Sequence, residues 1–278
     1  GIFDKRFEGF WTFHPLIPTW FHALFVQLFG LDLRLLRFAS LLCGAGLLAA
    51  VFSVSYQLSA SSRCAFIAVL LVVVSFAFIL SAHHIRYDII VAALAFSAIA
   101  IHLAASNRKS VLLSILAGLL LGMAFEVHVN AVIYGPVIVA LFFAEERWRF
   151  YCQRVFWGFV GGAAIALAWY LCAHVVRYPE TYFGIGRAMA GTHYPPLLLG
   201  SPLALIMAVA EMGRYLMILT QFRIVVTLVA GFMLWQRRLA RKELLMFLIG
   251  FISFGLMVKN KMDYYLILIA PFADIVLA

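Results

Sequence analysis

Long apolar runs separated by short polar segments dominate the pattern of this chain. A transmembrane helix needs about 20 mostly apolar residues, and shorter runs are tolerated where the bilayer thins locally. The pattern therefore predicts an all-α, polytopic bundle of transmembrane helices with about nine spans. The candidate spans are residues 36–58, 63–80, 87–105, 110–125, 131–145, 153–176, 220–236, 243–258 and 262–278.

Two further apolar stretches, at 14–30 and 202–219, are poor candidates for spans. The first is short and contains Pro18, and the second carries Glu211 and Arg214, which are unfavourable at the centre of a bilayer. We therefore expect both stretches to form amphipathic helices that lie at the membrane interface.

We expect the whole chain, residues 1–278, to form a single transmembrane domain, because no repeat or soluble domain interrupts the pattern. The spans lie in 36–176 and 220–278. The segments 1–35 and 177–219 are expected to be loops on the outer face, each with one interfacial helix. A GxxxG spacing in the fourth run is a weak signal of close helix packing.

Composition changes this picture little. Hydrophobic residues make up 65% of the chain and charged residues 12%, against about half and about a quarter in soluble domains. The 21 basic and 12 acidic residues give a net charge of +9. Such an excess would suggest nucleic acid for a soluble protein, but basic residues commonly flank spans on the cytoplasmic side. No nucleic-acid-binding motif is present, so we expect membrane lipid and no nucleic acid as partners.

The distribution of basic residues predicts the orientation. If both interfacial helices stay on the surface, the short loops on one side hold most Lys and Arg, and that side is expected to be cytoplasmic. The short loops on the outer side hold Arg86, Lys259 and Lys261. The assignment changes if either interfacial helix spans. The cytoplasmic set is Arg63, Arg108, Lys109, Arg147, Arg149, Arg154, Arg237, Arg238, Arg241 and Lys242.

Three outer turns, at 81–88, 126–131 and 259–263, concentrate side chains suited to chemistry. Basic residues at span ends often extend to the interface, and tyrosines suit the aromatic belt. Such structural roles explain any single residue in these turns. They explain the clustering less well, because the cytoplasmic turns at 59–63 and 106–110 carry no His or Asp. The candidates are His83, His84, Arg86, Asp88, Glu126, His128, Asn130, Lys259, Lys261 and Tyr265.

A cavity lined by cations, imidazoles and carboxylates predicts an anionic ligand such as a phosphate or pyrophosphate, which Arg and Lys hold well. If a helix runs through the first turn, His84 and Asp88 lie four residues apart on one face. The side chains of His83, His84, Asp88 and His128 also offer ligand types for a divalent metal, although the adjacent His83 and His84 point apart on a helix. No cofactor follows with certainty.

Several motifs occur in the order found in a known family of membrane enzymes. The first three motifs are Phe13-His14-Pro15-Leu16, Leu28-Phe29-Gly30 and Leu36-Arg37-Phe38-Ala39-Ser40. They are followed by three longer segments, His83 to Asp88, Glu126 to Pro136 and Lys261 to Pro271. Together they resemble glycosyltransferase family 39, which has the GT-C fold and includes the protein O-mannosyltransferases and the lipid A aminoarabinose transferases. Tyr87 stands where many bacterial members have proline.

The resemblance implies transfer of a sugar from a polyprenyl-phosphate donor to a lipid, protein or glycan acceptor. The reaction would take place on the periplasmic or extracellular face of a bacterial inner (plasma) membrane. In this family a carboxylate of the first outer loop is the general base, and basic residues hold the departing phosphate, which suits the predicted cavity. The family's acidic pair would precede Gly1, so we expect a fragment that lacks the catalytic base.

The resemblance also implies roles for single residues. Asp88 and Arg86 are the predicted catalytic residues, and Lys261 and Tyr265 are expected to contact phosphate. A transporter or flippase for a lipid-linked or anionic solute would use the same basic cavity, and a membrane scaffold would need the polar residues only as helix caps. Polar residues at span ends and the lack of a repeat favour the transferase. The predicted substrate-binding residues are His83, His84, His128, Asn130, Lys259, Lys261 and Tyr265.

Overall fold

Every regular element in the described part of the chain is a helix, which confirms the predicted all-α class. The predicted interfacial helix at 202–219, nearly all of the predicted span at 220–236, and Lys259 and Lys261 lie outside the described residues. The computed structural model describes residues 16–84, 86–180, 182–184, 232, 241–258 and 263–278. The helices are α1 (Leu16–Phe29), α2 (Leu33–Ser59), α3 (Ser62–Val73), α4 (Phe76–His83), α5 (Tyr87–Arg108), α6 (Val111–Val127), η2 (Val129–Ile133), α7 (Tyr134–Glu146), η3 (Arg147–Cys152), α8 (Arg154–Tyr170), η4 (Leu171–Val176), α12 (Arg241–Met257), η6 (Asp263–Leu268) and α13 (Ala270–Leu277).

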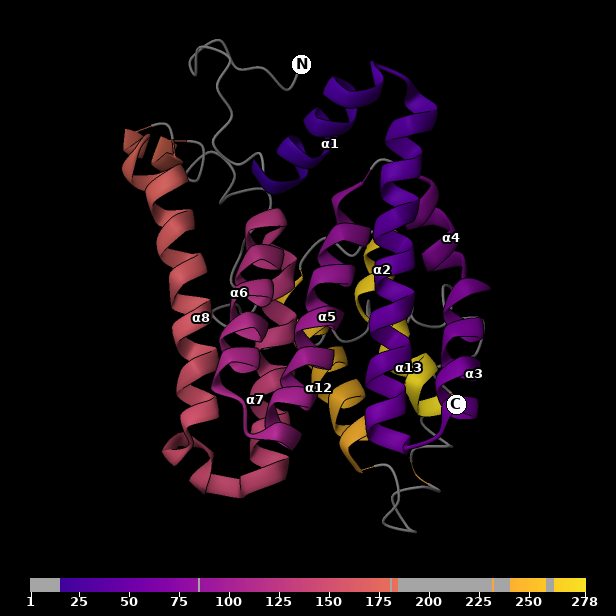
Figure 1. The fold of residues 1–278 in the computed structure, drawn as a ribbon, viewed down its shortest axis with the longest axis vertical. Coiled ribbons are helices and arrows are strands. Elements are labelled where there is room, and N and C mark those ends of the chain that lie inside the picture. Colours follow the sequence, from indigo (N-terminus) through magenta and orange to yellow (C-terminus); the bar gives the residue numbers. More distant parts are fainter. Residues whose placement is uncertain (1–15, 85, 181, 185–231, 233–240, 259–262) are drawn as a thin grey trace, which may run out of the picture.

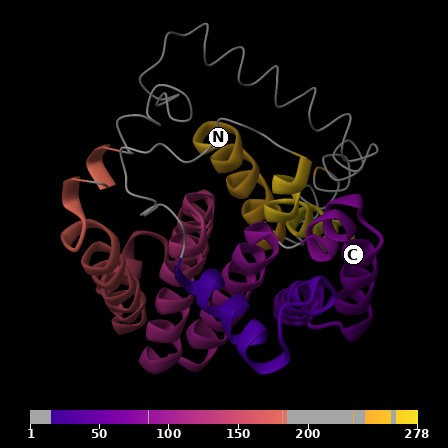
Figure 2. The ribbon, with the colours of Figure 1, turned by 90° about the horizontal axis from the view of Figure 1, so that it is seen from above.

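The helices pack in two layers. α3, α2, α5, α6 and α8 lie side by side in that order, whereas α7 packs on α12, and α13 connects α12 back to α3. In Figure 2, α12 and α13 (orange and yellow) lie on the side of the bundle away from α1 (indigo). Figure 1 shows α1 lying obliquely across one end of the bundle, which we call the upper end. The opposite end, with η3 and the start of α12, is the lower end.

Three of the described helices are long and apolar enough to cross a membrane: α2, α5 and the continuous α8–η4 unit at Arg154–Val176. The α3–α4 pair makes a fourth if it is counted as one bent span. Large exposed apolar side chains cover the outside of α8–η4, among them Trp157, Ile165 and Val176, as expected for a helix in contact with lipid. The chain is therefore an integral membrane protein, and the count of nine spans stays a prediction.

The predicted run at 63–80 is not one straight helix, because α3 and α4 meet at an angle of 65°. Ser75 starts the new helix by accepting a hydrogen bond from the Phe78 backbone N–H at 3.1 Å. Its hydroxyl also donates to the Val72 carbonyl oxygen at 2.7 Å. A serine that bonds to nearby backbone in this way competes with continuation of the preceding helix. The straight helix expected here is thus replaced by two helices with a sharp bend between them.

Small residues bring α6 and α8 into close contact. A Cβ atom at Gly118 would lie 2.1 Å from the Phe159 carbonyl oxygen, and a Cβ atom at Gly162 would lie 2.1 Å from the Ile115 carbonyl oxygen. Only glycine lets two helix backbones approach this closely. The GxxxG spacing from Gly118 to Gly122 is therefore a packing contact between the middle parts of α6 and α8.

Candidate functional site

The upper end of the bundle holds an Arg–Asp pair at the start of α5. Arg86 precedes the helix in an extended conformation, and Asp88 lies in the first turn, where the helix dipole favours a carboxylate. The Arg86 Nε lies 2.8 Å from the Asp88 Oδ2. The Asp88 side chain is 3% exposed and the Arg86 side chain is 35% exposed. A buried carboxylate therefore holds a cation that reaches the surface.

His83 and His84 lie in the turn before this pair and not on α5. α4 ends at His83, and the backbone of His84 is extended. The prediction that His84 and Asp88 share one helix face is therefore wrong, because the chain leaves the helical conformation to turn from α4 into α5. The His84 Nδ1 lies 2.7 Å from the Leu80 carbonyl oxygen, and both histidines are exposed. They stay candidates by position alone.

The turn between α6 and η2 contributes His128 and Asn130. The Asn130 backbone N–H donates to the His128 Nδ1 at 3.1 Å, so the neutral ring carries its proton on Nε2. That Nε2 lies 3.5 Å from the Tyr265 hydroxyl of η6, and the two ring centroids are 5.6 Å apart. Burial, together with the positive charge of Arg86, lowers the pKa of His128 to about 4. His128 is therefore a neutral imidazole within the electrostatic reach of Arg86.

η6, which carries Tyr265, lies close to the two turns described above. This short helix packs against α4 and α5, and the Tyr134 hydroxyl, at the start of α7, donates to the Leu268 carbonyl oxygen at 2.8 Å. Asn130 is buried at the same end of the bundle. The described candidates from three separate turns thus gather at the upper end, and their roles in binding or catalysis stay predictions. They are Arg86, Asp88, His128, Asn130 and Tyr265.

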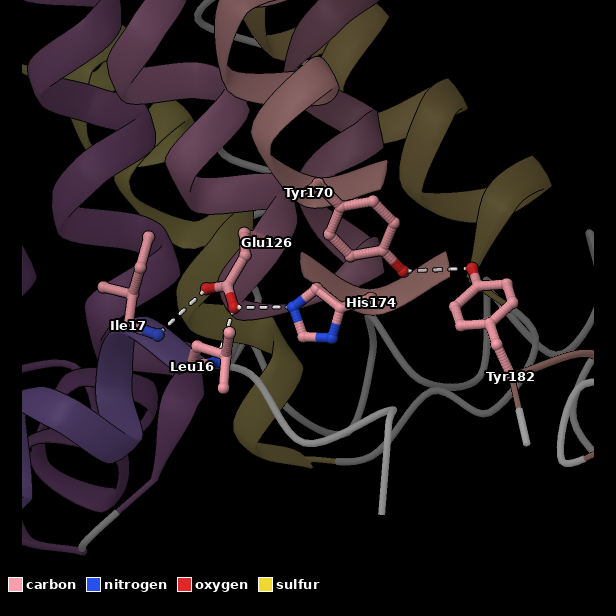
Figure 3. Close-up of polar contacts among 6 residues, drawn as sticks. All are labelled: Leu16, Ile17, Glu126, Tyr170, His174 and Tyr182. Carbon is pink, nitrogen blue, oxygen red and sulfur yellow. Dashed lines mark hydrogen bonds and ion pairs between the residues drawn. The ribbon is translucent and has the colours of Figure 1, made fainter. Parts of the chain in front are cut away.

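Glu126, near the end of α6, forms a second polar centre at the upper end (Figure 3). Its carboxylate accepts hydrogen bonds from the backbone N–H groups of Leu16 and Ile17 at the start of α1, the latter at 3.2 Å. The His174 Nε2 of η4 lies 3.2 Å from the Glu126 Oε1. The Glu126 side chain is 1% exposed and the His174 side chain 4%. One buried carboxylate therefore joins three elements that are far apart in the sequence.

Aromatic side chains border this second centre. The Tyr170 ring centroid lies 4.8 Å from that of His174, and the Tyr170 hydroxyl lies 3.1 Å from the Tyr182 hydroxyl. The sequence predicts no specific role for Glu126 and does not single out His174. His174 could have been recognised as a candidate because it is an ionisable residue inside the predicted span at 153–176, and such residues face the bundle interior.

The described residues contain no group of three or more His, Cys, Asp or Glu side chains that would hold a metal ion. What the upper end does offer is a partly exposed guanidinium, a buried carboxylate and a neutral imidazole–phenol pair. A cation next to hydrogen-bonding groups suits an anionic group that is attached to a polar one. The chemistry of this arrangement is therefore compatible with a phosphate ester as ligand.

Fold and site together define a polytopic helical membrane protein with an Arg–Asp pair at one end of the bundle. Residues 13–174, more than half of the chain, match the family described as dolichyl-phosphate-mannose-protein mannosyltransferase. The chain belongs to this family, which confirms the resemblance to GT-C glycosyltransferases.

The fold is similar to that of a solved protein, the crystal structure of ArnT from Cupriavidus metallidurans bound to undecaprenyl phosphate. The TM-score is 0.67 at 18% sequence identity, over 96% of this chain and 49% of that chain. At this identity the likeness shows a shared fold, and the chain spans about half the length of that protein. No curated protein matches the chain.

Proposed function

We propose that this protein acts as a membrane glycosyltransferase that moves a sugar from a polyprenyl-phosphate donor to a lipid, protein or glycan acceptor. Membership of the mannosyltransferase family supports the reaction class. The similar ArnT structure, solved with undecaprenyl phosphate bound, supports a polyprenyl-phosphate donor. The observation that carries the proposal is the gathering of Arg86, Asp88 and His128 from two separate turns at one end of the bundle.

Each residue of this group has a role that its surroundings support. Arg86 would stabilise the negative charge that develops on the lipid phosphate as its bond to the sugar breaks. Asp88 holds Arg86 through the ion pair at 2.8 Å and so fixes the position of that charge. His128 and Tyr265 offer a neutral hydrogen-bonding pair that suits sugar hydroxyls. Lys259 and Lys261 are retained as phosphate-binding candidates on the strength of the sequence.

We place the reaction on the outer, periplasmic face of a bacterial inner membrane. Basic residues are frequent in the loops at the lower end, as expected for a cytoplasmic side. α1 fits an interfacial helix, because it lies across the upper end and exposes Trp20, Leu24 and Leu28. The single domain with about nine spans, and a second interfacial helix at 202–219, belong to the same proposal.

A transporter or flippase for a lipid-linked or anionic solute is a second candidate. The 65° bend between α3 and α4 favours it, because transporters build their binding sites from broken helices near the membrane midplane. The transferase explains the position of the Arg86–Asp88 pair better, since this pair lies at a helix end.

The test is a transfer assay with the full-length protein in proteoliposomes. The donor is undecaprenyl phosphate that carries radiolabelled mannose or aminoarabinose, and a bacterial membrane extract supplies acceptors. Wild-type protein is expected to label an acceptor and to release undecaprenyl phosphate. Asp88→Asn should lower the rate about 100-fold or more, because it removes the charge that holds Arg86.

Asp32→Asn is the matched control. Asp32 caps α2 at the surface by accepting the Arg34 backbone N–H at 2.8 Å, and asparagine caps a helix equally well. This variant should therefore transfer sugar at the wild-type rate. Wild-type turnover in Asp88→Asn would remove that residue from the mechanism. A donor that crosses the bilayer without releasing undecaprenyl phosphate would support the flippase instead.

A further inference from the structure

The Glu126 carboxylate, the His174 imidazole and the first backbone N–H groups of α1 form a buried polar contact that we call the clasp (Figure 3). The first four N–H groups of a helix have no partner inside the helix. They are commonly capped by a side chain that directly precedes the helix. In α1 the acceptor instead comes from a residue 110 positions away from Leu16. The start of α1 is thus attached to the bundle by a long-range contact.

The chemistry of the clasp is well matched. A carboxylate is favoured at the positive end of the helix dipole, and hydrogen bonds from N–H groups to an ionised oxygen are among the stronger ones. In the tautomer that carries its proton on Nε2, His174 donates to the Glu126 Oε1. In that tautomer Glu126 receives three donors, two from α1 and one from η4.

The local form of α8 explains how His174 reaches Glu126. The α-helix ends at Tyr170 and continues as the π-helix η4. His174 is the buried residue of η4, whereas Leu171 and Val176 are exposed. Single π-helical turns inside an α-helix are frequent at functional sites. Here the wider turn directs one ionisable side chain into the bundle at the end of an otherwise apolar span.

The clasp lies next to the candidate site in the chain. Glu126 is two residues before His128, and the same turn thus holds α1 on one side and contacts Tyr265 on the other. His14 and Pro15, which form part of the family resemblance, directly precede Leu16 in the sequence. We propose that Glu126 and His174 are positioning residues: their clasp fixes the start of α1 against the turn that carries His128. Its effect on sugar transfer rests on the proposed function above.

The first test measures the clasp without any assay of activity. In full-length protein whose native cysteines are all replaced by alanine, the four of this chain among them, Ile17→Cys introduces a thiol at a partly buried position of α1. Glu126→Ala should raise its rate of maleimide labelling severalfold, because α1 is no longer held. Glu126→Gln should raise it less, since one amide oxygen still accepts a backbone N–H. Glu145→Gln, the same change at the lower end, should leave the labelling unchanged.

The second test measures transfer per folded molecule, with the folded fraction determined by size-exclusion chromatography. His174→Leu and Glu126→Ala should lower kcat about 10- to 100-fold, the range expected when reacting groups are displaced by about 1 Å. His174→Gln should restore much of the rate, because its side-chain amide still donates to Glu126. A residue that matters only for folding would change the yield and not the kcat of the folded protein. If Glu126→Ala does not fold, His174→Leu carries both tests.

Labelling of the introduced thiol that is insensitive to both Glu126→Ala and His174→Leu would overturn the clasp. Faster labelling with unchanged kcat would overturn the positioning role. If the wild-type protein transfers no sugar, the proposed function fails, whereas the labelling still decides whether the clasp holds α1.

Discussion

The two ends of the helix bundle use buried carboxylates in different ways. At the lower end, Glu145 of α7 accepts a hydrogen bond from the Ser106 hydroxyl of α5 and another from the Lys242 Nζ of α12, the latter at 2.9 Å. The Lys242 side chain is 38% exposed and that of Glu145 is 12% exposed. At the upper end, the side chains of Asp88 and Glu126 are 3% and 1% exposed. The lower group is a partly exposed link between helices, and the upper carboxylates are buried inside the protein.

The Arg86–Asp88 pair also differs from the lower group in what it connects. Lys242 and Glu145 belong to two helices, so their contact holds α7 to α12. Arg86 and Asp88 are two residues apart, and this ion pair by itself joins no separate elements. Burying a carboxylate is costly, and a carboxylate buried in such a local pair is a candidate for function. Anion binding by Arg86 would account for it.

The largest difference in transfer activity between the two ends is expected when the cation of each ion pair, Arg86 or Lys242, is replaced by alanine. Arg86→Ala should lower kcat/KM for the polyprenyl donor about 100-fold, because a charge-stabilising contact to the phosphate is lost. Lys242→Ala removes a cation paired with a carboxylate at the lower end and should leave kcat/KM within about twofold of wild type, as expected for an exposed pair. The transfer assay in proteoliposomes measures both variants. Equal losses would show that the upper end has no special role.

A smaller effect, this time on stability, is expected where α6 meets α8. Gly162→Ala places a methyl group against the Ile115 carbonyl oxygen and should lower the free energy of unfolding by about 1–3 kcal/mol. Because this contact aligns the helices that carry Glu126 and His174, the variant should also speed maleimide labelling when combined with Ile17→Cys. Thermal unfolding in detergent measures the first effect.

Gly161→Ala is the matched control for this change. A Cβ atom at Gly161 has nothing within 4 Å, and alanine is a better helix former than glycine. We expect this variant to unfold at the same temperature as wild type or slightly higher. If both substitutions lower the midpoint equally, the close approach of the two helices is not what aligns the clasp.

The sequence predicts the helices well and their interruptions poorly. A membrane requires every backbone polar group in a span to be bonded internally, so a long apolar run becomes a helix wherever it falls. The runs at 36–58, 87–105 and 110–125 accordingly coincide with α2, α5 and α6 to within three residues at each end. The bend at Ser75 and the π-helix η4 depend instead on a few local hydrogen bonds. Hydrophobicity carries no signal for such bonds.

The candidate site shows the same division. Arg86 and Asp88 are recognisable from the sequence because both charges stand at the start of an apolar run. The contact between Glu126 and His174 spans 48 residues and joins α6 to the continuation of α8, two helices that glycines let approach closely. Periodicity and composition carry no information on such a contact. Long-range pairs of this kind need the packing of the helices to be known first.

The smallest effect is expected for Lys242→Met, which keeps an apolar stem but removes the charge at the lower end. Exposed ion pairs contribute about 0–1 kcal/mol, and Lys242 is more than one-third exposed, so the free energy of unfolding should change by less than about 1 kcal/mol. Glu145→Gln and the double variant complete a mutant cycle in which the coupling energy is expected to stay within the same limit. Chemical unfolding in detergent measures it. A tenfold loss of transfer in Lys242→Met would mean that the lower end acts on the upper one, because Lys242 lies in the first turn of α12, at the end of the bundle opposite the Arg86–Asp88 pair. The contrast between a partly exposed link and a buried candidate site would then no longer hold.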